Sequence, residues 1–185
     1  MEKIIVFCQT FFWFTLSKIL YQFRFKNLGW SSYFYGLPIR LMGVNKLSIE
    51  KGTIILAGAR IEIHNKLNKR PKVRIGESCM IGHGLFISCL EKIEIEDGCL
   101  FSDNVAIIDN SHNHIPGEST VTSGLSSKAI LIKKNSTIYR NVTILEGVTI
   151  GEGSVIGANS IVKNDVKPFS VVVGSPAKQI KSLLH

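Results

Sequence analysis

The stretch that decides the fold runs from residue 132 to residue 167, and in groups of six it reads IKKNST IYRNVT ILEGVT IGEGSV IGANSI VKNDVK. Each group opens with an aliphatic residue: Ile132, Ile138, Ile144, Ile150, Ile156 and Val162. A small or β-branched residue lies two positions before the next group, at Ser136, Val142, Val148, Ser154 and Ser160. Such self-similarity at a fixed spacing is the signature of a repeat architecture.

The same spacing continues upstream, in blocks that differ in phase. The blocks are formed by Ile49, Ile55 and Ile61, by Ile75, Ile81, Ile87 and Ile93, and by Ile95, Phe101 and Ile107. Two irregular stretches separate the blocks: HNKLNKRPK at 64–72 and NSHNHIPGESTVTSGLSSK at 110–128. We therefore expect one long repeat array that is interrupted at two places.

A period of six fits a short strand followed by a tight turn, and three such units would close one triangular coil. The aliphatic residue of each unit would point inward, and the turns would fall on residues that tolerate positive φ, such as Asn141, Gly147, Gly153 and Asn159. Each coil then shields the apolar edge of the next. A β-sandwich is the alternative, but its strands recur about every 8–12 residues, which contradicts this register.

Composition indicates one globular domain with an anionic partner. The 185 residues are 45% hydrophobic and 19% charged, with a net charge of +8. Because no run of five basic residues occurs, we expect no nucleic-acid partner. Phosphates of a cofactor or an acidic membrane surface fit the charge better. The four cysteines form no C-x-x-C pair, so zinc-ribbon and redox motifs are absent from the sequence.

The N-terminal stretch MEKIIVFCQTFFWFTLSKILYQFRF predicts an apolar helix. Its uninterrupted apolar part is shorter than the ~20 residues of a spanning helix, and no cleavage site for a signal peptide follows. Two alternatives stay open. The helix packs on its own domain or on a neighbouring subunit, or residues 1–26 lie in the membrane interface with Trp13, Lys18, Arg24 and Lys26 as anchors.

The sequence thus divides into three parts. Residues 1–36 form the N-terminal apolar helical segment, and residues 37–175 form the β-helix domain, with a protruding loop at 110–129. Residues 176–185 are expected to form a short C-terminal helix, because Pro176 is suited to the start of a helix. The two terminal segments would cover the open ends of the coil stack.

The stretch IGEGSVIGANSIVKNDVKPFSVVVGSPAKQIK at 150–181 resembles the C-terminal signature of the hexapeptide-repeat acyltransferases. The nearest branch holds the galactoside and maltose acetyltransferases and the O-acetyltransferases of bacterial surface polysaccharides. The resemblance, over residues 45–182, implies an all-β, left-handed parallel β-helix. It also implies a homotrimer with active sites between subunits, and acetyl-CoA as co-substrate with no metal required. The left hand comes from the resemblance alone, since ordinary crossovers are right-handed.

The resemblance also implies a catalytic residue. The family pattern is an Asn-Val strand with a histidine seven residues after the valine, and here it matches Asn104, Val105 and His112. His112 would then be the general base, since imidazole titrates near neutrality and can take the proton of a sugar hydroxyl. Asp109 or a backbone carbonyl would orient its ring. Next to it, Asn113 and His114 are candidate contacts of the acceptor.

Positions that line the coenzyme A groove in the family correspond to Ser102, Arg140, Ala158, Lys163, Lys178 and Lys181. Four of these are cationic, which suits the pyrophosphate and 3′-phosphate of coenzyme A. The sequence departs from the galactoside and maltose enzymes at Gly82, where they place an asparagine that holds the acceptor. His83 follows and is a further candidate for acceptor binding.

These observations favour an O-acetyltransferase that acts on a sugar of bacterial surface polysaccharide (O-antigen or capsule) or its precursor. It would be cytoplasmic or peripheral at the inner membrane. An amino-sugar N-acetyltransferase or a xenobiotic acetyltransferase is the alternative within the fold. A hydratase resembling γ-class carbonic anhydrases is a third alternative, with zinc bound by His83, His112 and His114. However, His112 and His114 are closer together in the sequence than the last two zinc ligands of that family. A non-catalytic trimeric scaffold is the fourth alternative.

Overall fold

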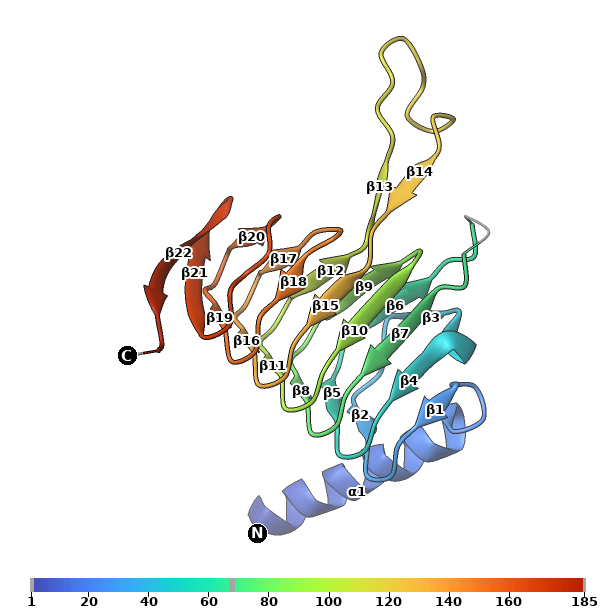
Figure 1. Ribbon diagram of the computed structural model, residues 1–185. Helices are drawn as coiled ribbons and strands as arrows, with labels where there is room; N and C mark the ends of the chain where they lie inside the picture. The colour runs from blue at the N-terminus through green and yellow to red at the C-terminus, as the bar shows by residue number, and fades with distance from the viewer. Residues whose placement is uncertain (1, 67–68, 185) are drawn as a thin grey trace.

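The computed structural model describes residues 2–66 and 69–184 and winds most of them into a three-sided prism of stacked coils (Figure 1). Each side of the prism is one sheet of parallel strands, apart from one antiparallel strand at the C-terminal end, and we name the sides sheets A, B and C. Successive strands of the chain visit the three sheets in turn, so that each sheet gains one strand per coil.

The bounds of the elements show how short the strands are. Sheet A contains β1 (Asn27–Leu28), β4 (Leu47–Ile49), β7 (Lys72–Ile75), β10 (Lys92–Ile95), β15 (Ile130–Ile132) and β18 (Thr149–Ile150). Sheet B contains β2 (Tyr33–Tyr35), β5 (Ile54–Leu56), β8 (Met80–Ile81), β11 (Leu100–Phe101), β16 (Thr137–Ile138), β19 (Val155–Ile156), β21 (Ser170–Gly174) and β22 (Ala177–Ser182). Sheet C contains β3 (Arg40–Met42), β6 (Arg60–Ile63), β9 (Phe86–Cys89), β12 (Ala106–Ile108), β17 (Thr143–Ile144) and β20 (Ile161–Val162).

The aliphatic residues of the repeat form one inward column on each side of the prism. On sheet C, for example, Ile61, Ile87, Ile107, Ile144 and Val162 are register partners from coil to coil. All five are buried, as are the corresponding columns of sheets A and B. Each run of six-residue spacing therefore passes through all three sides of one core, and the predicted all-β prism is confirmed.

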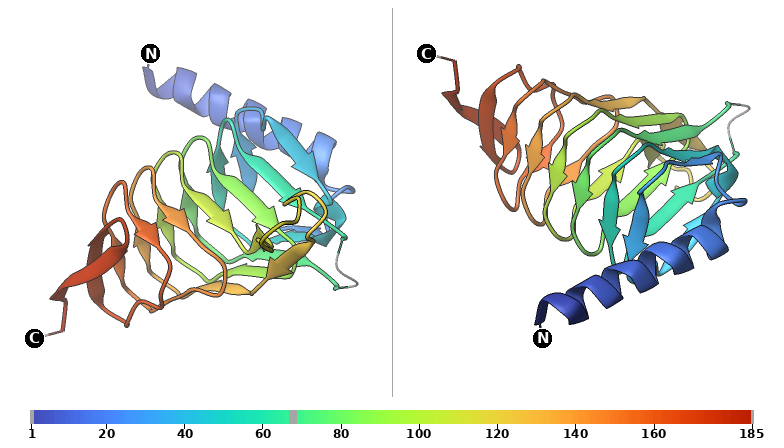
Figure 2. Two further views of the ribbon diagram at one scale, coloured as in Figure 1. Left: turned by 90° about the horizontal axis from the view of Figure 1, so that it is seen from above. Right: turned by 90° about the horizontal axis from the view of Figure 1, so that it is seen from below.

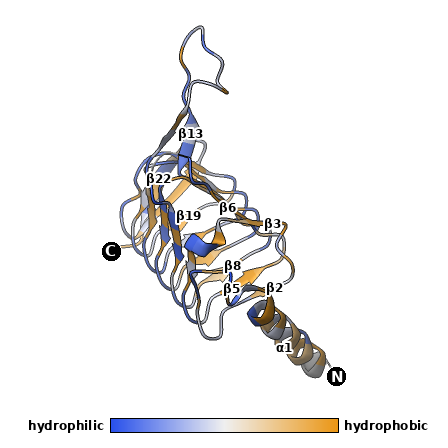
Figure 3. Ribbon diagram, turned by 90° about the vertical axis from the view of Figure 1, so that its right-hand side faces the viewer, coloured by the Kyte–Doolittle hydropathy of each residue, from blue (hydrophilic) through white to orange (hydrophobic). Residues whose placement is uncertain are grey.

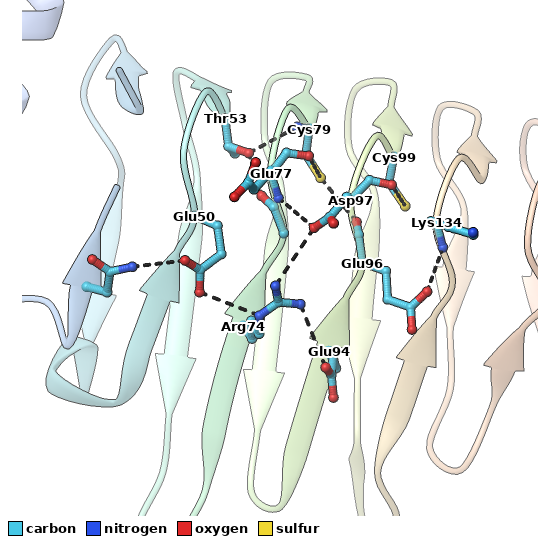
Figure 4. Close-up of polar contacts among 12 residues, drawn as sticks. Glu50, Thr53, Arg74, Glu77, Cys79, Glu94, Glu96, Asp97, Cys99 and Lys134 are labelled. Carbon is cyan, nitrogen blue, oxygen red and sulfur yellow. Dashed lines mark hydrogen bonds and ion pairs between the residues drawn. The ribbon is translucent and has the colours of Figure 1, made fainter. Parts of the chain in front are cut away.

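A second inward column lies at the corner between sheets A and B, and its side chains hydrogen-bond to the next coil (Figure 4). Thr53 Oγ1 donates to the Gly76 carbonyl at 2.7 Å, and Cys79 Sγ lies 3.3 Å from the Glu96 carbonyl. Ser136 and Ser154 repeat the contact in later coils. The buried thiol of Cys79 thus acts as a donor that satisfies a turn carbonyl.

The turns at two corners are tight and regular. Asn141 and Asn159 have φ values of 57° and 59°, and Gly153 is also left-handed, as the sequence predicts. Gly147 is left-handed too, but it lies at the third corner, between β17 and β18. At the corner between sheets B and C, the Asn141 amide donates to Asn159 Oδ1 at 2.9 Å, which links neighbouring coils. Asparagine serves here because it tolerates this backbone and also supplies a hydrogen bond.

The third corner, between sheets C and A, holds the irregular segments. They are the 3-10 helix η1 (Val44–Lys46), the connection from β6 to β7, and the hairpin of β13 (Asn110–His112) and β14 (Leu125–Ser127). The hairpin and its tip, residues 110–127, form an arm that projects from the prism on the side away from helix α1 (Figures 1 and 2). The predicted protruding loop is therefore a β-hairpin.

The single α-helix of the described residues, α1 (Glu2–Tyr21), packs against β2, the first strand of sheet B. The Ser17 hydroxyl accepts the Phe34 N–H at 3.0 Å and donates to the Phe34 carbonyl at 3.2 Å. Tyr21 and Phe25 pack edge to face on Phe34 and close this end of the core. No helix among the described residues has the length and hydropathy needed to cross a membrane.

Both predicted boundaries at the chain ends need correction. The helical segment was expected to extend to residue 36, but α1 ends at Tyr21, and β1 and β2 already belong to the first coil. The C-terminal helix is also wrong, because residues 177–182 form β22, antiparallel to β21. Without β22, the last parallel strand would expose an unpaired edge. Gly174, at φ 102°, allows the chain to reverse there, so Pro176 stands in a turn.

Candidate active site

The arm grows out of sheet C where the repeat is broken. His112 pairs with Leu125 across the hairpin, and Ser111 Oγ lies 2.9 Å from Ser126 Oγ. Beyond the strands, Asn113 Nδ2 donates to the Ser123 carbonyl at 2.9 Å. The amide of Asn113, predicted to contact the acceptor, thus braces the arm from within. The predicted acceptor contact His114 lies exposed on the same arm.

Asp109 fixes the base of the arm. Its carboxylate is fully buried and accepts the backbone N–H groups of Leu90, Glu91 and Lys92 at 2.7, 2.8 and 2.9 Å. Asp109 therefore holds the corner of the preceding coil and does not orient the ring of His112, which was one of two expectations. Among the described residues, no side chain hydrogen-bonds to that ring.

His112 is exposed and lies between two hollows of the surface. One hollow, of about 360 Å³, is lined by Lys66, His112, Val121, Thr122, Gly124 and Leu125. The other, of about 200 Å³, is lined by His64, Lys66, Ser88, Leu90, Asn110, His112 and Leu125. Because His112 borders both, its imidazole could contact two reactants, one in each hollow.

The sequence analysis missed His64, which lines the second hollow. His64 Nε2 lies 3.6 Å from Glu62 Oε2, and Glu62 also pairs with Arg60 at 2.9 Å and Arg40 at 3.2 Å. The hydrogen bond from Arg60 holds the pKa of the buried Glu62 carboxyl below its usual value, although burial opposes this. This network places a negative charge behind the His64 ring.

A signal for His64 was present in the sequence. Ile61 stacks on Ile87 and Ile87 stacks on Ile107, so His64 occupies the same position of its coil as Asn110. The two irregular stretches therefore begin at the same corner, two coils apart. Aligning them by the six-residue register would have placed His64 near the start of the arm.

Three of the predicted coenzyme A residues come together at the corner between sheets B and C. Ser102, Arg140 and Ala158 follow β11, β16 and β19, which are neighbours in sheet B. Lys178 and Lys181 lie on β22 at the end of this sheet, and Lys163 follows β20 of sheet C. All the cations of the set are exposed, which suits them to an anionic ligand.

His83 does not join His112, because it lies at the corner between sheets B and C. Its N–H and its ring Nδ1 lie 2.8 and 3.2 Å from Asp103 Oδ1, and these contacts hold the pKa of Asp103 below its usual value. Only glycine fits at position 82, because a Cβ there would lie 2.6 Å from the backbone of Ser102. The described part of the chain contains no group of three His, Cys, Asp or Glu side chains placed to hold a metal ion.

Residues 129–164 match the family model described as bacterial transferase hexapeptide (six repeats). The fold is that of the hexapeptide-repeat transferases. The left-handed parallel β-helix expected from the resemblance is therefore confirmed as the fold class. A search of curated protein sequences finds no match for this chain.

Solved structures of hexapeptide-repeat enzymes resemble this one over most of its length. A mutant of AntD, an N-acyltransferase from Bacillus cereus in complex with dTDP and coenzyme A, is 21% identical with a TM-score of 0.75, covering 89% of this chain and 88% of that one. The hexapeptide-repeat acetyltransferase VCA0836 from Vibrio cholerae is 25% identical with a TM-score of 0.65, covering 93% and 82%. The polySia-specific acetyltransferase NeuO is 24% identical with a TM-score of 0.52, covering 85% and 78%.

Proposed function

We propose that the chain is an acetyl-CoA-dependent O-acetyltransferase that acts on a sugar hydroxyl of bacterial surface polysaccharide or its precursor. The observation that carries the proposal is the position of His112, exposed between two hollows at the one corner where the repeat opens. The fold and the similar enzymes, solved in complex with coenzyme A and acetyl coenzyme A, support the acyl donor.

The proposed reaction needs a single proton carrier. His112 takes the proton of the acceptor hydroxyl as its oxygen attacks the thioester carbonyl. When the tetrahedral intermediate collapses, the C–S bond breaks and the imidazolium returns the proton to the thiolate of coenzyme A. Imidazole suits both steps because it titrates near neutral pH.

A trimer would complete the proposed site. Within one chain, His112 stands at the corner between sheets C and A, whereas Ser102 and Arg140 stand at the corner between sheets B and C. Two protomers packed side by side around a three-fold axis would bring unlike corners together. The coenzyme would then lie along the cationic corner of one protomer and present its thioester to the His112 of the next.

A second candidate is N-acylation of an amino sugar, which AntD, described as an N-acyltransferase crystallised with dTDP, favours. An amine acceptor would use the same hollows and would leave the coenzyme groove unchanged. A panel of matched hydroxyl and amino sugars, free and nucleotide-linked, with radiolabelled acetyl-CoA separates the two. Acetylation of hydroxyl sugars supports the first proposal, and acetylation of amines alone supports the second.

Substitution of the base tests the proposed mechanism. We expect His112→Ala to lower kcat about 10²- to 10⁴-fold, the range for loss of general base catalysis. Light scattering and circular dichroism should show an unchanged assembly, because His112 is exposed. His114→Ala, two residues along the arm, is the control and should alter KM more than kcat. Retained turnover in His112→Ala would dismiss its role as base.

A further inference from the structure

Helix α1 exposes apolar side chains on the sides that do not pack on the prism. Gln9, Trp13 and Ser17 form the inner stripe, which contacts β2. The side chains exposed around α1 and the residues after it are Ile5, Val6, Phe7, Phe11, Phe12, Ile19, Leu20, Phe23, Trp30, Leu37 and Ile39. Phe23 and Trp30 are 97% and 78% exposed. An exposed apolar surface of this extent normally marks a site that binds protein or lipid.

Figure 3 shows α1 in mostly hydrophobic colours, projecting from the prism on the side opposite the arm. On the flank of the helix, Phe7, Phe11, Phe14 and Tyr33 line a shallow apolar hollow of about 250 Å³. The exposed apolar side chains on this flank are therefore adjacent to one another. We call the eleven exposed residues named above the α1 face.

Positive charge lies beside the part of the α1 face that follows the helix. Residues 1–51 contain seven Lys and Arg residues but two acidic residues, whereas residues 52–185 contain fifteen and twelve. Arg24, Lys26 and Lys51 are exposed, and within the described residues none of them forms an ion pair. The Gly52 N–H donates to the Trp30 carbonyl at 3.1 Å, which brings the turn of Lys51 beside Trp30.

We propose that the α1 face lies in the surface of an anionic lipid bilayer, with Phe23 and Trp30 in the interface and Arg24, Lys26 and Lys51 against lipid phosphates. Aromatic and aliphatic side chains bordered by cations are typical of interfacial helices. A second copy of this chain would bring the same cations toward themselves, which disfavours the copy as occupant. The proposal is independent of the acetyl transfer proposed above.

Two of the four residues expected from the sequence to anchor the helix face the prism. Trp13 packs on Tyr35 with ring centroids 6.5 Å apart. Lys18 Nζ donates to the Gly29 carbonyl at 2.7 Å, and burial lowers the pKa of this amine. Lys18 thus ties α1 to the first coil, and Phe23 and Trp30 take over the predicted anchoring role.

Cys8 provides a probe for the test. Cys8 is exposed on α1, whereas Cys79, Cys89 and Cys99 are buried, so a thiol-reactive, environment-sensitive fluorophore should label Cys8 selectively in the native full-length chain. The labelled protein is titrated with vesicles of phosphatidylcholine alone and of phosphatidylcholine with phosphatidylglycerol. Sedimentation of unlabelled protein with the same vesicles controls for the dye. We expect a blue shift and co-sedimentation with the anionic vesicles, weakened by salt.

Variants locate the contact. The pairs Arg24→Glu/Lys26→Glu and Phe23→Ser/Trp30→Ser should each lower vesicle affinity at least about tenfold. The matched control Lys167→Glu/Ile180→Ser changes one exposed cation and one exposed apolar residue at the other end of the prism and should bind like wild type. Circular dichroism and the acetyl-transfer rate should be unchanged in the two α1 variants.

Three results would overturn the proposal. They are absence of binding to anionic vesicles, equal binding to neutral vesicles, and binding that survives both pairs of α1 substitutions. Light scattering adds a positive identification of the competing occupant. The competing result has two parts: the wild type does not bind vesicles, and Phe23→Ser/Trp30→Ser lowers the molecular mass in solution. A second copy of the chain would then cover the α1 face.

Discussion

The corner between sheets B and C and the corner between sheets C and A accept very different amounts of chain. At the first, the turns repeat with left-handed asparagines, and their side chains connect one coil to the next. At the second, η1, the connection after β6 and the arm add chain of different lengths. The comparison shows that this prism carries its long insertions, and with them His112, at the corner whose turns depart from the repeat.

Packing explains why the regular corners cannot vary in this way. At Gly151, an added Cβ would lie 2.3 Å from the nitrogen of Pro168 in the next coil, and at Gly76 it would lie 2.6 Å from the backbone of Glu96. The coils therefore touch backbone to backbone at these turns. At the tip of the arm, Gly117 has no atom within 4 Å of such a Cβ, so chain can be added there freely.

The largest expected effect is the loss of stability caused by an insertion at a regular corner, compared with the same insertion in the arm. Two glycines inserted after Asn141 would displace Val142 and Ile144 from the core, where both are fully buried. We expect a loss of at least about 4 kcal/mol in the free energy of unfolding, the cost of removing two buried aliphatic side chains. The same insertion after Gly117 should leave the urea midpoint unchanged. Equal stability of the two variants would contradict the difference between corners.

The next largest effect is the loss of stability when a carboxylate at the corner between sheets C and A is removed. Asp109 accepts three buried backbone N–H groups, whereas the exposed Asp165 accepts one, from Thr149 at 2.7 Å. Asp109→Ala should cost at least about 3 kcal/mol of unfolding free energy, and Asp165→Ala about 1 kcal/mol or less. Chemical denaturation measures both. Similar losses would mean that solvent satisfies the N–H groups of Leu90–Lys92 once the carboxylate is gone.

The smallest effect is a pH dependence from Glu62, beside the hollow that His64 lines. Because the folded pKa of Glu62 is lowered, its contribution to stability is complete above the unfolded pKa of about 4.3 and is lost as the pH falls through the folded value. Wild type should therefore exceed Glu62→Gln in urea midpoint at pH 7, with the difference shrinking below about pH 4.3. Glu118→Gln, exposed on the arm, is the control. A difference that grows on acidification would refute the assigned ion pairs.

Much of the fold could be predicted because each six-residue unit of the sequence specifies its own strand and turn. Six-residue spacing determines which side chains face inward, and asparagine or glycine marks the turns, so the columns and corners follow from the sequence. The C-terminal strand could not be predicted in this way. Residues 177–182 carry no repeat, and they form a strand because β21 offers an unpaired edge, which is a tertiary effect.

The candidate site was predicted in part for a related reason. His112 lies in the stretch 110–128, where the six-residue spacing is interrupted, and this interruption is visible in the sequence. The role of Asp109 was hidden, since a carboxylate beside a histidine reads as its partner until the stacking with Leu90–Lys92 is known. His64 was missed because only the alignment of two distant breaks brings it near the start of the arm.

The opposite placement of α1 and the arm has a consequence for the acceptor (Figure 2). A protein resting on lipid through its helix would hold His112, in the lower part of the arm, on the side of the molecule away from the headgroups. The first sugar of a lipid-attached chain would then stay out of reach below it. A soluble nucleotide sugar could reach the imidazole from the solvent. A lipid-attached glycan could reach it only if the glycan were longer than the distance from the bilayer to the arm.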